Sequence, residues 1–157
     1  MPKEIERKFL VKRLESIPLQ NGLAIKQGYI PTYKRTKTAV RIRLYGDNAF
    51  LTIKGKSKGA TRSEFEYAIP VEEAHQMIRE LCGRSLIEKV RYKIDYSGVT
   101  WEVDVFEGQN EGLILAEVEL ESEDQAIVLP DWVDKEVTDD QRYYNANLVV
   151  NPFKRWK

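Results

Sequence analysis

Residues 3–11 read Lys-Glu-Ile-Glu-Arg-Lys-Phe-Leu-Val, and this stretch decides the fold class. Its charges recur at every second position, at Glu4, Glu6 and Lys8, with apolar residues between them and one exception at Arg7. Successive side chains of a β-strand point to opposite faces, so a period of two predicts a strand with one charged and one apolar face.

The same two-residue rhythm continues along most of the chain. Turn sequences such as Gly46-Asp47-Asn48 and Ser97-Gly98 separate the alternating segments, as in antiparallel hairpins. We expect eight strands, at residues 3–11, 24–30, 38–45, 49–54, 62–69, 86–96, 99–107 and 113–121.

Helices are expected at three places only. Apolar residues at three- and four-residue spacing predict an amphipathic helix over 71–82, ended by Gly83. Ser122 is a good N-cap for a short helix toward Leu129. Thr138, with Gln141 three residues later, resembles a capping box that starts a last helix through about Val149.

Few helices cannot cover both faces of a large open sheet, whereas closure of the sheet removes its exposed edges. The sequence therefore predicts a mainly β (α+β) fold, with eight strands in an antiparallel barrel or closed meander and a few peripheral helices. At 157 residues the chain fits a single domain spanning 1–157.

Composition excludes several classes of protein. The 25 basic and 25 acidic residues cancel, which disfavours a DNA-coating protein, and we expect no nucleic-acid partner. One Cys and one His cannot build a structural zinc site or a disulfide within the chain. The charged N-terminus lacks the apolar core of a signal peptide, and no apolar run approaches a membrane span. We expect a cytoplasmic protein without membrane attachment; the sequence carries no signal of an oligomeric state.

The polar strand faces are almost entirely charged. They carry six cations, at Lys8, Arg41, Arg43, Lys54, Lys89 and Arg91. They also carry seven carboxylates, at Glu4, Glu6, Glu64, Glu66, Asp104, Glu117 and Glu119. Members of an i, i+2 pair lie on one side of a strand, roughly 6.5–7 Å apart.

A charged strand face is usually a solvated surface. If the barrel turns this face inward, however, the charges line a cavity that is costly to form unless a charged ligand and cations satisfy it. Tripolyphosphate, with roughly four to five negative charges near neutral pH, matches the cations. The surplus carboxylates suit Mg²⁺ or Mn²⁺.

These residues also resemble a known family. Glu4-Ile5-Glu6-Arg7-Lys8 is similar to the Glu-x-Glu-x-Lys signature of the CYTH superfamily, the triphosphate tunnel metalloenzymes. The likeness continues in order through Gln27-Gly28-Tyr29, Arg41-Ile42-Arg43, Thr52-Ile53-Lys54, 62–66, 88–92, 102–106, Glu117-Val118-Glu119, 136–140 and Arg142-Tyr143. The sequence looks most like the small bacterial single-domain members that act as inorganic tripolyphosphatases.

The resemblance implies an eight-stranded antiparallel barrel enclosing a polar tunnel, with the final helix closing one mouth. It assigns substrate binding to Lys8, Arg41, Arg43, Lys54, Lys89, Arg91 and Arg142. It assigns metal binding to Glu4, Glu6, Asp104, Glu117 and Glu119, with Glu64 and Glu66 as further candidates. Lys8 and Tyr29 resemble a catalytic Lys–Tyr pair in which the Tyr accepts a proton.

We expect one Mg²⁺ or Mn²⁺ ion between Glu4, Glu6 and the phosphate chain, and a second held partly by Glu117 and Glu119. The expected reaction is hydrolysis of the terminal phosphate of inorganic tripolyphosphate, a small-molecule substrate. The same tunnel also suits a class IV-type adenylate cyclase, a thiamine or nucleoside triphosphatase, or a polyphosphate-binding barrel without turnover. No base-binding residue is evident in the sequence, which favours the bare polyphosphate.

Overall fold

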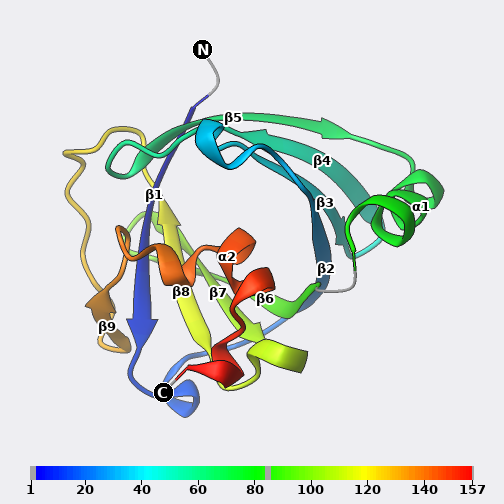
Figure 1. The fold of residues 1–157 in the computed structure, drawn as a ribbon. Helices are drawn as coiled ribbons and strands as arrows, with labels where there is room; N and C mark the ends of the chain where they lie inside the picture. Colours follow the sequence, from blue (N-terminus) through cyan, green and yellow to red (C-terminus); the bar gives the residue numbers. More distant parts are fainter. Residues whose placement is uncertain (1–2, 84–85, 157) are drawn as a thin grey trace.

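Eight antiparallel strands close into a barrel in the computed structural model, which describes residues 3–83 and 86–156 (Figure 1). Around the barrel the order is β1-β5-β4-β3-β2-β6-β7-β8, and β8 pairs with β1 again. The strands are β1 (Lys3–Val11), β2 (Leu23–Ile30), β3 (Ala39–Tyr45), β4 (Asn48–Lys54), β5 (Thr61–Ala68), β6 (Ile87–Tyr96), β7 (Val99–Phe106) and β8 (Ile114–Glu119). The predicted fold class and all eight predicted strands are confirmed.

Strand β1 closes the barrel and is shared between three partners. One edge pairs with β8, and Glu6 lies opposite Glu119 there. The other edge pairs with β5 at residues 3–5 and then with a ninth strand, β9 (Val133–Glu136), around Phe9 and Val11. Strand β9 was not predicted from the sequence, because four residues are too few to display an alternation.

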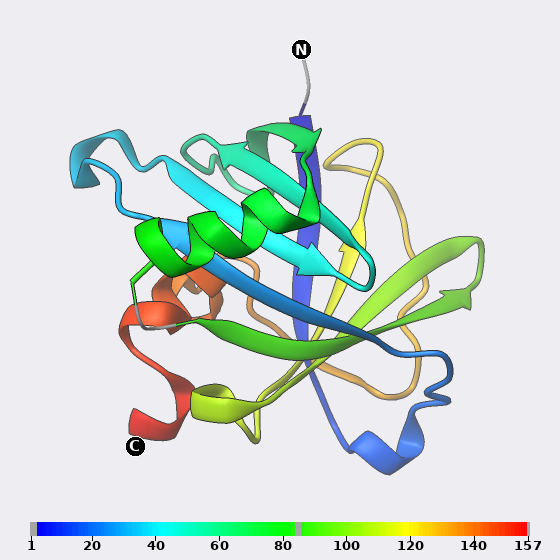
Figure 2. The ribbon, with the colours of Figure 1, turned by 90° about the vertical axis from the view of Figure 1, so that its right-hand side faces the viewer.

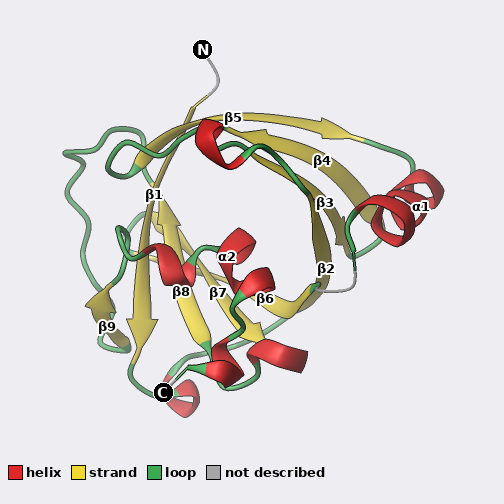
Figure 3. Cartoon of the chain, viewed as in Figure 1, coloured by secondary structure: helices red, strands yellow, loops and turns green. Residues whose placement is uncertain are grey.

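The helix expected from Ser122 toward Leu129 is wrong. This segment runs as a loop between β8 and β9 (Figure 3), and the Ser122 hydroxyl donates to Asp124 instead of capping a helix. The segment passes over the outer barrel surface, where Ile127 and Trp132 pack into the apolar core. That packing outweighs the weak local helix signal.

The last helix starts later than the sequence indicates. Thr138 accepts a hydrogen bond from the backbone N–H of Lys8 and caps no helix. A 3-10 turn, η4 (Gln141–Tyr143), comes first, and α2 (Asn145–Val150) follows. The cap residue of η4 is Asp140, whose side chain accepts from the backbone N–H of Arg142.

Most of the apolar packing lies on the outer face of the barrel. Helix α1 (Val71–Leu81) covers β2, β3 and β4 on one side (Figure 2), where Ala74 and Ile78 pack against Ile42. On another side, Phe9 and Trp101 are covered by Trp132, with the two indole rings 5.7 Å apart. With apolar side chains outside, the alternating polar side chains of the same strands must point inward.

The C-terminal segment lies across one mouth of the barrel. Figure 1 shows α2 within the ring of strands, and Leu148 is fully buried there against Leu115 and Phe106 from the inner barrel face. This apolar cluster closes the mouth, and the charged side chains of the inner face lie deeper in the barrel. None of the helices in the described residues has the length and apolar character that a bilayer crossing requires.

A close contact at Gly28 gives a first prediction. A Cβ atom at Gly28 would lie 2.6 Å from Cβ of Cys82 and 2.9 Å from Cδ2 of Leu86. Gly28→Ala should therefore lower the free energy of unfolding by about 1–3 kcal/mol, measured by urea denaturation. Gly55→Ala is the matched control, since its Cβ would meet Ser63 at an ordinary 3.5 Å. Equal losses in the two variants would contradict this packing argument.

Candidate active site

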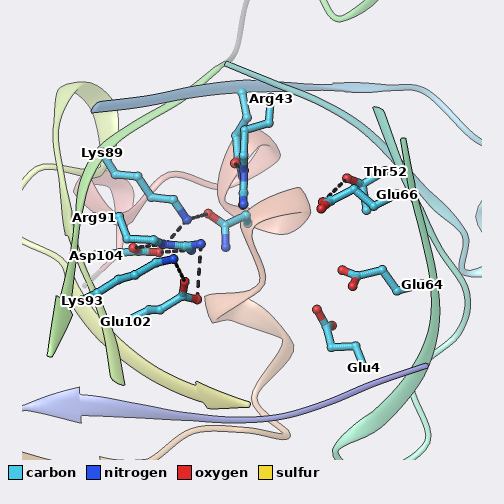
Figure 4. Close-up of polar contacts among 12 residues, drawn as sticks. Glu4, Arg43, Thr52, Glu64, Glu66, Lys89, Arg91, Lys93, Glu102 and Asp104 are labelled. Carbon is cyan, nitrogen blue, oxygen red and sulfur yellow. Dashed lines mark hydrogen bonds and ion pairs between the residues drawn. The ribbon is translucent and has the colours of Figure 1, made fainter. Parts of the chain in front are cut away.

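Three glutamates on one side of the barrel interior, the acidic wall, face two buried cations on the opposite side, the basic wall, and each side also carries charges of the other sign (Figure 4). Figure 4 shows Glu4, Glu64 and Glu66 side by side on one wall, while Lys89 and Arg91 project from the opposite one. The acidic residues come from β1 and β5 and the basic ones from β6. Barrel closure thus brings the predicted carboxylates and cations into one interior.

A buried ion cluster anchors the basic wall. Nε and Nη2 of Arg91 donate to the two oxygens of Asp104 at 2.8 and 2.9 Å, and Lys89 Nζ lies 2.6 Å from Oδ2. Burial raises the pKa of Asp104, but the two cations outweigh it and hold that pKa below its ordinary value. Both oxygens of Asp104, an expected metal ligand, are therefore occupied by protein cations.

The positive charges of Lys89 and Arg43 are not fully compensated by neighbouring carboxylates. Burial, with the positive charges of Arg91 and Arg43, lowers the pKa of Lys89 to about 7 despite Asp104. Burial and the neighbouring guanidiniums of Arg41 and Arg91 lower the pKa of Arg43. Within the described residues Arg43 makes no ion pair, and its Nε donates to Gln27 Oε1 at 2.6 Å. These depressed pKa values indicate positive charges that an anion would stabilise.

Arg41 offers a donor without a partner. Its Nη2 donates to Thr52 Oγ1 at 3.1 Å and to Glu66 at 3.4 Å, whereas its buried Nε has no hydrogen-bond acceptor among the described residues. A buried donor left unpaired costs about 1–3 kcal/mol. A phosphate oxygen would satisfy this N–H and add opposite charge.

The acidic residues form pairs that differ from the sequence expectation. The carboxyl groups of Glu6 and Glu117 lie within hydrogen-bonding reach of each other across β1 and β8, and those of Glu4 and Glu64 do so across β1 and β5. The sequence suggested the neighbours along one strand, Glu4 with Glu6 and Glu117 with Glu119. Glu119 is exposed, although partial burial and Glu4 still raise its pKa.

The carboxyl groups of Glu6 and Glu117 have pKa values shifted in opposite directions. Burial first, then Glu117 and Glu4, raise the pKa of Glu6 well above its ordinary value. Burial also opposes ionisation of Glu117, but Lys8 and the hydrogen bond from Glu6 hold its pKa well below the ordinary value. The pair thus retains a proton between two oxygens, a place where a cation could bind instead.

These pairs fit Mg²⁺ or Mn²⁺ under one condition. Among the described residues no group of three or more His, Cys, Asp or Glu side chains is arranged to hold a metal ion. Mg²⁺ is usually bound by one or two carboxylates together with water and substrate phosphates. A carboxylate pair therefore suffices if the substrate supplies the other ligands. Lys54, 2.9 Å from Glu4, competes for that carboxylate.

Two other expected residues, Lys8 and Tyr29, lie inside but are not joined by a hydrogen bond within residues 3–83 and 86–156. Lys8 Nζ donates to the carbonyl oxygen of Tyr143 at 3.3 Å and lies 5.2 Å from the centre of the Tyr144 ring. The Tyr29 hydroxyl accepts a hydrogen bond from Gln27 Nε2 at 3.1 Å.

Arg142 lies apart from the other expected substrate-binding residues. Its side chain is 61% exposed and pairs with Asp140 at 2.7 Å. It also contacts the ring of Trp156, on the C-terminal segment. The structure brings the other six cations to the barrel interior but leaves Arg142 on the surface.

Several interior residues have a place in the site that the sequence alone did not assign to them. Gln27 is fully buried and uncharged, so a search for charged alternation passes over it, although its spacing from Tyr29 was a usable signal. Asn145 accepts from Lys89 Nζ at 3.0 Å through a contact far apart in sequence, which no local pattern reveals. Glu102 pairs with Arg91 at 3.4 Å, and its i, i+2 spacing from Asp104 could have identified it.

The chain is similar to known proteins over nearly its whole length. The family model described as "CYTH domain" matches residues 2–145. The inorganic triphosphatase of Acetivibrio thermocellus is 48% identical over 157 residues, covering 100% of this chain and 99% of that protein. The inorganic triphosphatase of Nitrosomonas europaea is 38% identical, covering 94% and 97%.

Solved structures share the fold. The crystal structure of the inorganic triphosphatase NE1496 has a TM-score of 0.67 and 36% identity, covering 96% of each chain. A putative adenylate cyclase from Bacillus halodurans has a TM-score of 0.61 and 20% identity, covering 78% of this chain and 84% of its own, and is similar in fold alone.

The ion cluster predicts a large stability effect at Asp104. Asp104→Asn should lower the free energy of unfolding by about 3–5 kcal/mol, because it leaves two buried cations without their shared carboxylate. Asp134→Asn, at an exposed position of β9, should change it little. Urea denaturation measures both variants. A loss at Asp104 no larger than that at Asp134 would contradict the proposed anchoring role.

The raised pKa of Glu6 predicts a pH-dependent effect on stability. Its folded state keeps a proton that the unfolded chain releases near the ordinary value of 4.5, so stability is lost as pH rises from there through the folded pKa. Glu6→Gln, neutral at every pH, should therefore stabilise the metal-free protein at about pH 8 and have little effect at about pH 4. Denaturation at the two pH values tests this. Glu80→Gln, exposed on α1, is the control, and a stabilisation independent of pH would refute the argument.

Proposed function

The chain belongs to the CYTH domain family, and from this premise we propose that it is an inorganic triphosphatase, a hydrolase that releases the terminal phosphate of tripolyphosphate. The proposal rests above all on one observation: Arg41 and Arg43 present buried guanidiniums whose charge and hydrogen-bonding capacity exceed their protein partners. The two inorganic triphosphatases related to it over nearly their full lengths support the same activity.

The interior cations bind and orient the phosphate chain. Positive charge surrounds the phosphate chain inside the barrel, where electrostatic interactions are stronger than in water. It comes from Lys8, Arg41, Arg43, Lys54, Lys89 and Arg91. Phosphoryl transfer depends mainly on positioning and charge neutralisation, and fixed cations provide both without reorganising during the reaction. Asp104 contributes by holding Arg91 and Lys89 in place.

The carboxylate pairs would hold the metal. CYTH triphosphatases are generally metal-dependent, and Mg²⁺ or Mn²⁺ is the proposed ion here. Glu6 and Glu117 would be its principal ligands, with further carboxylates nearby at Glu4, Glu64, Glu66 and Glu119. When bound, the ion supplies a Lewis acid that neutralises phosphate charge and activates a water molecule.

Tyr29 and Lys8 are the proposed catalytic residues. Tyr29 lies directly opposite Arg41 in the β2–β3 ladder, so its hydroxyl belongs to the layer that holds the phosphate chain. As a phenolate, after loss of its own hydroxyl proton, Tyr29 would accept a proton from the attacking water, which the neutral hydroxyl cannot do. Lys8 places a positive charge beside the same chain and is held by the C-terminal segment.

Activity measurements test the proposal. Phosphate release from tripolyphosphate should require a divalent ion and stop on chelation. Arg43→Ala should lower kcat/KM by about 10²-fold or more, since a preorganised cation is lost. Arg79→Ala, exposed on α1, is the control and should retain activity. Full turnover in the presence of chelator, or in Arg43→Ala, would overturn the assignment.

Products from ATP separate the alternatives. A nucleoside triphosphatase forms ADP and phosphate from ATP, whereas a cyclase forms cyclic AMP and pyrophosphate. Anion binding that shows no turnover and no dependence on metal would instead indicate a polyphosphate-binding barrel.

A further inference from the structure

Gln27 is a fully buried polar residue between two functional side chains. It lies on β2, directly opposite Arg43 in the ladder with β3. Its Oε1 accepts from Arg43 Nε at 2.6 Å, and its Nε2 donates to the Tyr29 hydroxyl at 3.1 Å. One amide thus connects a proposed phosphate-binding group with a proposed catalytic one.

The chemistry of the partners fixes the orientation of this amide. A guanidinium has N–H donors and no acceptor, so the oxygen of Gln27 must face Arg43. The NH₂ group then necessarily faces Tyr29, whose hydroxyl oxygen accepts its hydrogen. As a result, the hydroxyl proton of Tyr29 points away from Gln27. Because Nε of Arg43 is taken, its terminal NH₂ groups remain for a ligand.

Packing keeps Gln27 in this position. The next residue, Gly28, lies against Cys82 and Leu86 so closely that it has no room for a Cβ atom. Strand β2 pairs with β3 on one edge, where Gln27 lies opposite Arg43. On its other edge it pairs with β6, where Gln27 lies opposite the fully buried Ile87. The backbone that carries Gln27 is therefore held on both sides, and its side chain has no route to solvent.

We propose that Gln27 is a positioning residue that couples the Arg43 guanidinium to the Tyr29 hydroxyl and sets the orientation in which both meet the phosphate chain. This inference rests on the proposed triphosphatase function. Gln27 itself touches no reacting atom. It acts through Arg43 and Tyr29, so a substitution of Gln27 should lower activity or binding less when the neighbour concerned is itself substituted.

Double-mutant cycles test this coupling. Gln27→Met, similar in size but without the two hydrogen bonds, should lower kcat for tripolyphosphate by about 10- to 100-fold through misplacement of the reacting groups. In a Tyr29→Phe background the same change should have little further effect on kcat. Gln76→Met, exposed on α1, is the matched control and should leave kcat unchanged. An undiminished loss in the Tyr29→Phe background would overturn the proposed coupling of Gln27 to Tyr29.

A binding measurement tests the contact between Gln27 and Arg43 in the absence of turnover. Calorimetry with tripolyphosphate and no metal should give a dissociation constant about 5- to 10-fold weaker for Gln27→Met. The loss of affinity should be smaller in an Arg43→Lys background. Equal losses in the wild-type and Arg43→Lys backgrounds would overturn the coupling of Gln27 to Arg43. Thermal melts verify folding, and Gln27→Asn, polar but too short to reach both partners, gives a second test of the same losses.

Failure of this inference differs from failure of the proposed function. A wild-type protein that releases no phosphate from tripolyphosphate with Mg²⁺ or Mn²⁺ refutes the function. An active wild-type protein with additive effects of Gln27 and Tyr29 refutes only the positioning role.

Discussion

The burial of ionised side chains inside a closed barrel is the constraint on which the rest of this structure depends. A buried charge is tolerated only with a partner of opposite sign, and Arg91, Lys89 and Asp104 meet this condition among themselves. Arg41 and Arg43 do so incompletely, and Glu6 and Glu117 oppose each other. The interior therefore has unsatisfied positive and negative regions, which a polyphosphate with a divalent cation would satisfy together.

The barrel can hold such an interior because its apolar core lies largely outside. Helix α1 covers one outer surface, and the segment that leads to Trp132 covers another. These layers supply hydrophobic stabilisation that the charged interior cannot provide. Stability and function are thereby assigned to opposite faces of the same strands, and two-residue alternation is the simplest way for a sequence to encode that separation.

Uncharged groups organise the charged ones. The Tyr143 carbonyl accepts from Lys8 and the Asn145 side chain accepts from Lys89, so the C-terminal segment both closes a mouth and holds two lysines. Gln27 performs a similar task for Arg43 and Tyr29. Hydrogen bonds that the cations donate to neutral acceptors orient the cations without neutralising them, which leaves their charge available to an anion.

The strands, the barrel class and the alternation that puts Glu4, Glu6 and Lys8 on one face could be predicted from the sequence, because these features depend on local periodicity. The sequence also identified six cations that the structure gathers inside. The partners of these side chains could not be predicted. Glu6 meets Glu117 across strands, Asp104 is paired with Arg91 and Lys89, and Arg142 lies on the surface. Strand register and the path of the C-terminal segment set these contacts. Both arise from packing between residues far apart in the chain, which periodicity does not encode.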